Sequence, residues 1–179
     1  MRKVSIKVQL KKSSEILKVM HDSGKIFSDE YQQFDRVFVP RGHEQFYPDA
    51  ALIPQLLIRT NTIDKQISHT MILKRPVSKN MTYFFQTQIM DYNQTAHIIN
   101  NMGYELTAEV AKNRRKLVIG SIIIYLDQIN EKYYLKIEKN LRNDETDNVD
   151  ELWDLLTSFN LTTVQEEVGR YSDIVSKRK

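Results

Sequence analysis

Alternating apolar and polar residues predict strands over most of the chain. From Lys3 to Lys11 every second residue is apolar, so the predicted strand has one apolar and one polar face. Similar patterns, or short apolar runs bounded by turn-forming residues, predict the other strands. These are expected at residues 31–39, 55–60, 69–74 and 82–90, and in three segments between 110 and 138. The chain is therefore expected to contain seven or eight strands, mostly antiparallel.

Helical periodicity is limited to shorter segments between and after these strands. One helix is expected to follow a serine N-cap at residue 13 or 14 and to end at Gly24. A second is expected over residues 92–102, with Met102 toward the core. Further helices are expected over residues 149–159 and 162–173, and the terminal SKRK sequence is expected to fray. Together the patterns predict an α+β fold.

Strands with one polar and one apolar face are compatible with two architectures. In a closed barrel the polar faces would line a wet, charged lumen, and the helices would pack outside. In an open α+β sheet the same polar faces would lie in solvent. The pattern alone leaves both architectures open.

Composition and charge narrow the classes of function. A chain of 179 residues is expected to form a single domain over residues 1–179. The absence of cysteine excludes disulfides, thiolate metal sites and a cysteine nucleophile. A net charge of +3 gives no argument for nucleic-acid binding, and five unclustered glycines argue against a phosphate-binding loop. With no long apolar run, neither a membrane span nor a signal peptide is expected, and a cytoplasmic location is predicted.

The stretch from residue 110 to residue 138 is the best organised part of the sequence. Lys112 and Arg114 lie two residues apart on a predicted strand, so both side chains point to the same face. Asp127 ends the apolar strand that follows, and Glu138 lies near the end of a third strand that alternates. Strands of this kind suit the wall of a polar cavity.

Several segments along the chain resemble one protein family. They are QFDRVFVP (33–40), LLIR (56–59), MILKRP (71–76), VAKNRRKL (110–117), IIIYLDQI (122–129) and YLKIE (134–138). Their sequences and order resemble the CYTH family, or triphosphate tunnel fold, which includes class IV adenylyl cyclases and thiamine triphosphatases. The resemblance covers nearly the whole chain. It implies a closed, mostly antiparallel eight-stranded barrel with helices packed outside.

The sequence departs from this family where the family holds its divalent metal. The motif Glu-x-Glu-x-Lys on the family's first strand corresponds here to Ser5, Lys7 and Gln9. The first glutamate of its Glu-Ile-Glu strand is replaced by Lys136. The three charged positions of its Arg-x-Glu-x-Glu strand correspond to Phe84, Gln86 and Gln88, and the first arginine of its Leu-Arg-Ile-Arg strand corresponds to Leu57.

The charged residues that match the family's pattern imply a site that binds an anion and has fewer acidic ligands for a metal. The resemblance makes these cations candidate ligand-binding residues: Arg59, Lys74, Lys112, Arg114, Lys7 and Lys136. Arginine forks and lysine point charges are suited to phosphate oxygens. Asp127 and Glu138 remain as candidate ligands for Mg²⁺ or Mn²⁺, which two acids would hold weakly. Alternating Lys and Arg residues are also typical of a solvated strand face.

Three functions therefore remain open. The first is a binding module for a nucleotide, triphosphate, polyphosphate or other anion, or a protein-interaction domain, with metal-dependent catalysis lost or weakened. The second is an active cyclase or triphosphatase that uses Asp127, Glu138 and a displaced acid such as Asp35 or Glu109. The third is a plain α+β domain. Neither a membrane nor a nucleic acid is expected as a partner, and a homodimer is left open.

Overall fold

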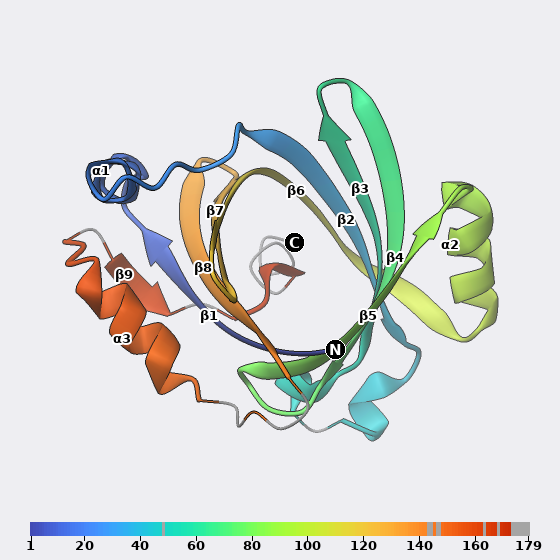
Figure 1. Cartoon of the computed structure of the whole chain (residues 1–179). Coiled ribbons are helices and arrows are strands. Elements are labelled where there is room, and N and C mark those ends of the chain that lie inside the picture. Colours follow the sequence, from blue (N-terminus) through green and yellow to red (C-terminus); the bar gives the residue numbers. More distant parts are fainter. Residues whose placement is uncertain (48, 143–144, 146–147, 163, 168, 173–179) are drawn as a thin grey trace. The chain divides into compact units, whose positions relative to one another are not determined.

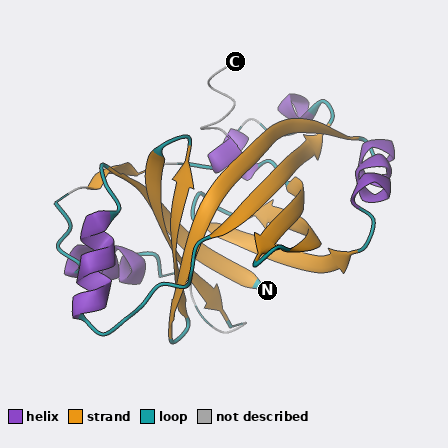
Figure 2. Cartoon of the chain, turned by 90° about the horizontal axis from the view of Figure 1, so that it is seen from above, coloured by secondary structure: helices purple, strands orange, loops and turns teal. Residues whose placement is uncertain are grey.

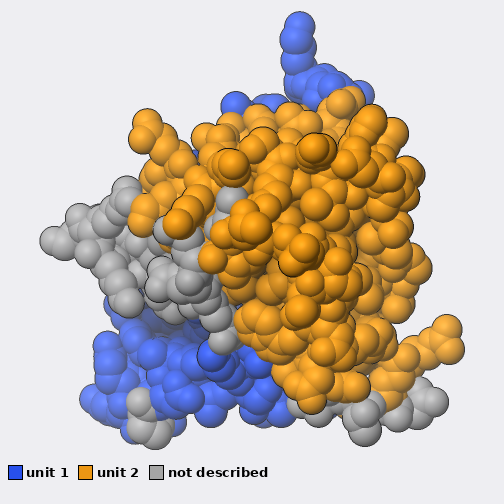
Figure 3. All heavy atoms as spheres, turned by 90° about the vertical axis from the view of Figure 1, so that its left-hand side faces the viewer, with its two compact units in different colours: residues 1, 32–111, 169–179 blue, residues 2–31, 112–168 orange. Residues whose placement is uncertain are grey.

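The chain divides into two compact units, which Figure 3 colours separately. Unit 1 comprises residues 1, 32–111 and 169–179, and unit 2 comprises residues 2–31 and 112–168. The computed structural model describes residues 1–47, 49–142, 145, 148–162, 164–167 and 169–172 (Figure 1). Strand β6 (Tyr104–Ile119) has its first half in unit 1 and its second half in unit 2. That residues 1–179 form a single domain stays a prediction.

Unit 2 is built on an antiparallel sheet. Its other strands are β1 (Arg2–Leu10), β7 (Ile122–Ile129), β8 (Lys132–Leu141) and the short β9 (Val164–Glu167). The order is β6-β7-β8-β1-β9, and the pairs from β6 to β9 are antiparallel. Asn130 and Glu131 have φ of 46° and 68°, the left-handed backbone that a two-residue hairpin loop between β7 and β8 requires.

Two helices cover one face of the unit 2 sheet (Figures 1 and 2). They are α1 (Ser14–Asp22) and α3 (Asp150–Ser158). Their buried side chains, and the apolar residues of β1 on the same side of the sheet, form the core of this unit: Ile16, Met20, Leu152, Leu156, Val4, Ile6, Val8 and Leu10. Because strand side chains alternate, the polar residues of these strands lie on the opposite face.

Unit 1 contains further strands of the same sheet, to which β6 also belongs. Its strands are β2 (Tyr31–Pro40), β3 (Gln55–Ile63), β4 (Gln66–Pro76) and β5 (Met81–Ile89), in the order β5-β4-β3-β2-β6. Helix α2 (Tyr92–Asn101) packs Ile99 against Phe38, Leu56 and Ile58. The connection between β2 and β3 contains two 3-10 turns, η1 (His43–Gln45) and η2 (Ala50–Leu52).

The predicted α+β class and the antiparallel pairing are confirmed, and four local predictions are wrong. The β3–β4 hairpin turns at Asp64 and Lys65, with φ of 49° and 67°, so both strands are longer than predicted. Strand β6 begins at Tyr104 rather than near residue 110. Met102 is 64 % exposed instead of packing in the core. Residues 164–167 of the predicted final helix form β9, and the SKRK sequence lies outside the described residues.

The final helix was mispredicted because β9 forms by pairing with a strand that lies far away in the sequence. Its residues pair with Val8, Gln9 and Leu10 of β1, more than 150 positions earlier in the chain. Local periodicity does not contain such a partner. Among the described helices, none is both long and apolar enough to cross a membrane.

Candidate functional site

The strand register of unit 2 aligns polar side chains in rows on the face opposite α1 and α3. One row runs Gln9, Tyr134, Asp127 and Arg114, and the next runs Lys7, Lys136, Tyr125 and Lys116. In the third row Ser5 lies opposite Glu138. Five of the cations on this face are called the cation cluster below: Lys3, Lys7, Lys112, Arg114 and Lys136. The predicted polar face therefore exists, and it belongs to one compact unit.

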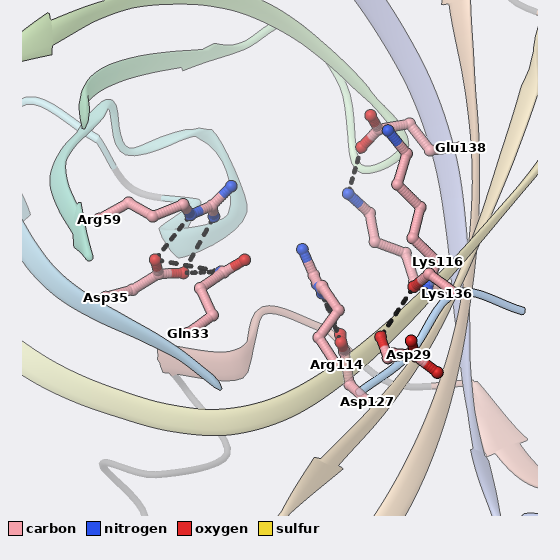
Figure 4. Close-up of polar contacts among 10 residues, drawn as sticks. Asp29, Gln33, Asp35, Arg59, Arg114, Lys116, Asp127, Lys136 and Glu138 are labelled. Carbon is pink, nitrogen blue, oxygen red and sulfur yellow. Dashed lines mark hydrogen bonds and ion pairs between the residues drawn. The ribbon is translucent and has the colours of Figure 1, made fainter. Parts of the chain in front are cut away.

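Glu138 is a buried carboxylate in contact with two lysines of the cluster, of which Figure 4 shows Lys136. Lys3 Nζ donates to Oε1 at 2.6 Å, and Lys136 Nζ donates to Oε2. Burial alone would raise the pKa of the Glu138 carboxyl, but the two ammonium groups hold that pKa well below its usual range. Glu138 is therefore an anion whose two oxygens each accept from a lysine.

Arg114 and Asp127 form a bidentate ion pair inside the same face (Figure 4). Nε donates to Oδ1 at 2.5 Å and Nη2 donates to Oδ2 at 2.6 Å, and the Asp127 residue is 0 % exposed. The guanidinium carbon of Arg114 also lies 4.1 Å from the centre of the Tyr125 ring. The Nζ of Lys136 lies 5.6 Å from the centre of the same ring. These contacts fix the orientation of the Arg114 guanidinium group and of the Lys136 side chain.

Lys7 lies among charges of its own sign. It is the direct cross-strand partner of Lys136, so the two Cβ atoms are expected about 5 Å apart. Burial lowers the pKa of the Lys7 ammonium well below its ordinary value, and Lys136, Lys112 and Arg114 lower it further. Asp127 acts in the opposite direction. Among the residues named here, the five cations of the cluster outnumber the two carboxylates, Asp127 and Glu138.

The chemistry that this arrangement favours is the binding of an anion. The five cations of the cluster share the face with the carboxylates of Asp127 and Glu138, in surroundings where water screens charge poorly. An anion with several negative charges would reduce the repulsion between Lys7 and its neighbours. It would also receive charge-assisted hydrogen bonds from lysine and arginine nitrogens.

The same residues do not fit a divalent metal. Asp127 is opposite Tyr134, and Glu138 lies four residues further along β8, about 13 Å at roughly 3.3 Å per residue. Each carboxylate already accepts hydrogen bonds from cations on both oxygens. In the part of the chain that the structure describes, no three His, Cys, Asp or Glu residues gather into a metal site. Mg²⁺ and Mn²⁺ require several oxygen ligands around one point.

Unit 1 contains a separate polar network built on β2 and β3 (Figure 4). Arg59 donates to both oxygens of Asp35, at 2.7 Å from Nε and 3.0 Å from Nη2. Gln33 Nε2 donates to the same carboxylate, at 3.2 Å and 3.0 Å. Lys74 lies opposite Gln55, four residues along β3 from Arg59, so these two predicted ligand residues are not neighbours.

The structure groups six of the eight residues that the sequence predicted for the site. Lys7, Lys112, Arg114, Asp127, Lys136 and Glu138 lie in unit 2, whereas Arg59 and Lys74 lie in unit 1. That any of them contacts a ligand or metal stays a prediction. Sequence reasoning missed Lys3 and Tyr125. The alternation of β1 already placed Lys3 on the face of Lys7, and Tyr125 lies two residues before Asp127 on β7, so the signal for both was present.

A small cavity in unit 2 lies on the other side of the same strands. It measures about 160 Å³ and is lined by Leu17 of α1 together with Arg115, Gln128 and Tyr133. Pockets for drug-sized ligands usually measure about 300 Å³ or more. This cavity is therefore too small for a nucleotide and takes no part in the cation cluster.

Comparison with known proteins adds information at the level of the fold. No protein family model and no curated protein sequence matches the chain. Solved structures do match. A protein from Pyrococcus horikoshii superposes with a TM-score of 0.80 at 16% identity, over 99% of both chains. A candidate adenylate cyclase from Vibrio parahaemolyticus gives 0.72 at 18% identity, over 96% of both chains.

A third match is a candidate adenylyl cyclase from Hippeastrum with a dominant triphosphatase activity. It gives a TM-score of 0.58 at 14% identity, over 99% of this chain and 96% of that one. Identities this low establish a shared fold. The predicted α+β fold class is confirmed over nearly the whole chain. The chain therefore has the fold of the CYTH, or triphosphate tunnel, proteins.

Proposed function

We propose that this chain binds a triphosphate-containing or other polyanionic ligand through the cation cluster of unit 2, and that metal-dependent catalysis is lost or weakened. The observation that carries the proposal is the position of Lys7, half-buried and directly opposite Lys136. The ligand classes that fit are a nucleotide, an inorganic triphosphate and a polyphosphate chain. We place this activity in the cytoplasm.

The charges of the cluster favour a ligand with several phosphate groups over one with a single charge. Lys112 and Arg114 lie close enough to Lys7 to lower its pKa. Successive phosphate groups would place one negative charge near each cation. Each charge-assisted hydrogen bond is worth about 1.5–3 kcal/mol, so several contacts make specific binding feasible.

The donor set supports the proposed loss of catalysis. Transfer of a phosphoryl or adenylyl group requires positive charge on the phosphates and divalent ions that bridge them. Asp127 and Glu138 lie two rows apart, and both are held by cations of the protein. In addition, β1 supplies no carboxylate to this face. Among the described residues, the cations required for binding are present, whereas the oxygen ligands required for the metal are not gathered.

A second candidate is an active cyclase or triphosphatase, and the Vibrio and Hippeastrum structures favour it. Such an enzyme would use Asp127, Glu138 and a displaced acid. Of the two acids considered, Asp35 accepts from Arg59 and Gln33, and Glu109 pairs with Arg36 at 2.8 Å. Each of these carboxylates is already paired with a basic side chain. We therefore rank binding above catalysis.

Titration calorimetry with sodium tripolyphosphate and with ATP tests the binding proposal. Lys7→Met is expected to weaken binding about tenfold or more, because it removes one charged contact worth about 1.4 kcal/mol or more. Lys132→Met on the exposed end of β8 is the matched control and is expected to leave Kd unchanged. Absence of binding heat for both ligands, with and without Mg²⁺, would reject the proposal.

Product analysis tests the enzyme alternative. Wild-type protein is incubated with ATP or tripolyphosphate and either Mg²⁺ or Mn²⁺, and release of phosphate or of cyclic AMP with pyrophosphate is measured. We expect neither. Metal-dependent turnover that disappears in Glu138→Ala would establish the enzyme and its residue. Turnover that persists in Glu138→Ala would place catalysis elsewhere.

A further inference from the structure

We infer that the cluster takes its ligand as a metal-free polyanion, so that Mg²⁺ competes with the protein for the ligand. This inference rests on the proposed function. Lys3 and Lys136 are the residues that keep a divalent ion away from Glu138. Their ammonium groups occupy the oxygens of Glu138, where a divalent ion would otherwise bind.

Both carboxylate oxygens of Glu138 are in contact with lysines. Lys3 Nζ lies 2.6 Å from Oε1, and Lys136 Nζ donates to Oε2, so both oxygens serve a protein cation. The side chain of Glu138 is only 5% exposed. A divalent ion would have to displace both ammonium groups into surroundings that already hold an excess of positive charge. The two lysines therefore already neutralise this carboxylate.

The nearest residues on the same face as Glu138 do not add a carboxylate to it. Its cross-strand partner on β1 is Ser5, and the next residue of β1 on that face is Lys7. Neither supplies a carboxylate, and Lys7 would repel a divalent cation. Asp127 lies two rows away and accepts from Arg114 on both of its oxygens. Within the described part of the chain, no second acid is therefore positioned to share an ion with Glu138.

A free triphosphate and its magnesium complex differ in charge and in the oxygens that they offer to the protein. A triphosphate that carries Mg²⁺ has part of its negative charge neutralised and some of its oxygens covered by the ion. Such a complex would bring a divalent cation against Lys7, Lys112 and Lys136. The free anion instead offers all of its oxygens to these ammonium groups. The cluster is therefore expected to select the free anion over its magnesium complex.

Calorimetry with tripolyphosphate at constant ionic strength tests this inference. One titration contains a chelator, and a second contains enough Mg²⁺ to complex nine-tenths of the ligand. Sodium chloride equalises the ionic strength, because screening alone weakens charged contacts. The apparent Kd is expected to rise about tenfold with Mg²⁺, since only the free tenth of the ligand binds. Binding that Mg²⁺ leaves unchanged or strengthens would overturn the inference while the proposed function stands.

Variants of one strand separate the cluster from a general charge effect. Lys136→Glu reverses one charge of the cluster and is expected to weaken metal-free binding more than about tenfold. Lys132→Glu makes the same change at an exposed residue of β8, and we expect less than about a twofold effect. Lys136→Gln provides a milder change if the reversal prevents folding. Equal losses in Lys132→Glu and in the Lys136 variants would overturn the assignment.

A direct metal titration completes the test. The free protein is titrated with millimolar Mn²⁺, and no saturable binding is expected. Saturable Mn²⁺ binding that Glu138→Ala abolishes would show that the lysines do not exclude the ion, and it would overturn the inference. Absence of tripolyphosphate binding under every condition would instead reject the proposed function itself.

Discussion

Lys7 on β1 lies directly opposite Lys136 on β8, in the middle row of the cation cluster. Like charges that face each other across two strands destabilise a sheet, and burial increases the penalty. Glu138 balances part of the charge of Lys136, but Lys7 also has Lys112 and Arg114 among its influential neighbours. The like charges of Lys7 and Lys136 therefore repel each other across the two strands.

Removal of the Lys7 charge is expected to stabilise the free protein. In Lys7→Met the stem keeps its apolar contacts while the charge and its repulsion are lost, so the free energy of unfolding should rise by about 1 kcal/mol. For a chain of this size such a change raises Tm by about 2–4 °C. Thermal unfolding without ligand measures it. Lys132→Met should stay within about 0.5 kcal/mol of wild type, and a lower Tm in Lys7→Met would contradict the prediction.

The pKa shifts of the same two lysines predict a pH dependence. Burial lowers the pKa of both Lys7 and Lys136 below the ordinary lysine value. Between the lowered pKa and the ordinary value of about 10.4, the unfolded chain binds more protons than the folded protein. The contribution of these lysines to the free energy of unfolding therefore increases as pH rises through that window.

Comparison of wild type with Lys7→Met isolates this contribution from other titrating groups. Chemical unfolding is measured at several pH values between neutral and pH 10. The stability advantage of Lys7→Met should shrink as pH rises, because wild-type Lys7 loses its proton and its repulsion. The charged neighbours that enter this balance are Lys112, Arg114, Asp127 and Lys136. A difference that stays constant over the whole range would show that Lys7 does not titrate there.

The Arg114–Asp127 pair is expected to be the most sensitive contact of unit 2. Asp127→Asn removes the charge that balances Arg114, which is only 5% exposed, and loss of one partner of a buried pair costs about 3–5 kcal/mol. Thermal unfolding should show a Tm decrease of several degrees or more. Glu109→Gln, in the more exposed pair with Arg36, is the matched control and should cost less than about 1 kcal/mol. Equal effects would contradict the prediction.

The sequence predicted the parts of the fold that depend on local alternation. The pattern of β1 gave its apolar face and its polar face correctly, and the spacing of Lys112 and Arg114 placed both on one face. These predictions required only the two-residue period of a strand. The resemblance to the CYTH family supplied the order of the elements, and the shared fold confirms it.

The cross-strand arrangement of the site was beyond such reasoning. Which residue of β1 faces Lys136, and whether Asp127 and Glu138 share a row, depend on register between distant strands. The two lysines on Glu138 follow from that register together with side-chain length. The separation of Arg59 and Lys74 along the β3–β4 pair has the same origin. Short motifs do not contain this information.

Arg59 is expected to act in unit 1 through its pair with Asp35. Asp35 is 3% exposed and accepts from Arg59 and Gln33, so Arg59→Gln leaves a buried carboxylate with one charged partner fewer. We expect a loss of about 3 kcal/mol in the free energy of unfolding. Asp35→Asn together with Arg59→Gln should recover part of that loss, with a coupling energy of about 1–3 kcal/mol in a double-mutant cycle.

Ligand binding by the same double variant separates a structural role from a binding role. If Arg59 only balances Asp35, the double variant should bind tripolyphosphate as tightly as wild type, because the cation cluster of unit 2 is unchanged. If Arg59 itself contacts phosphate, binding should fall about tenfold or more even though stability is partly recovered. The sequence predicted the second outcome for Arg59. The bidentate geometry of its pair with Asp35 favours the first, because two of its nitrogens already donate to that carboxylate.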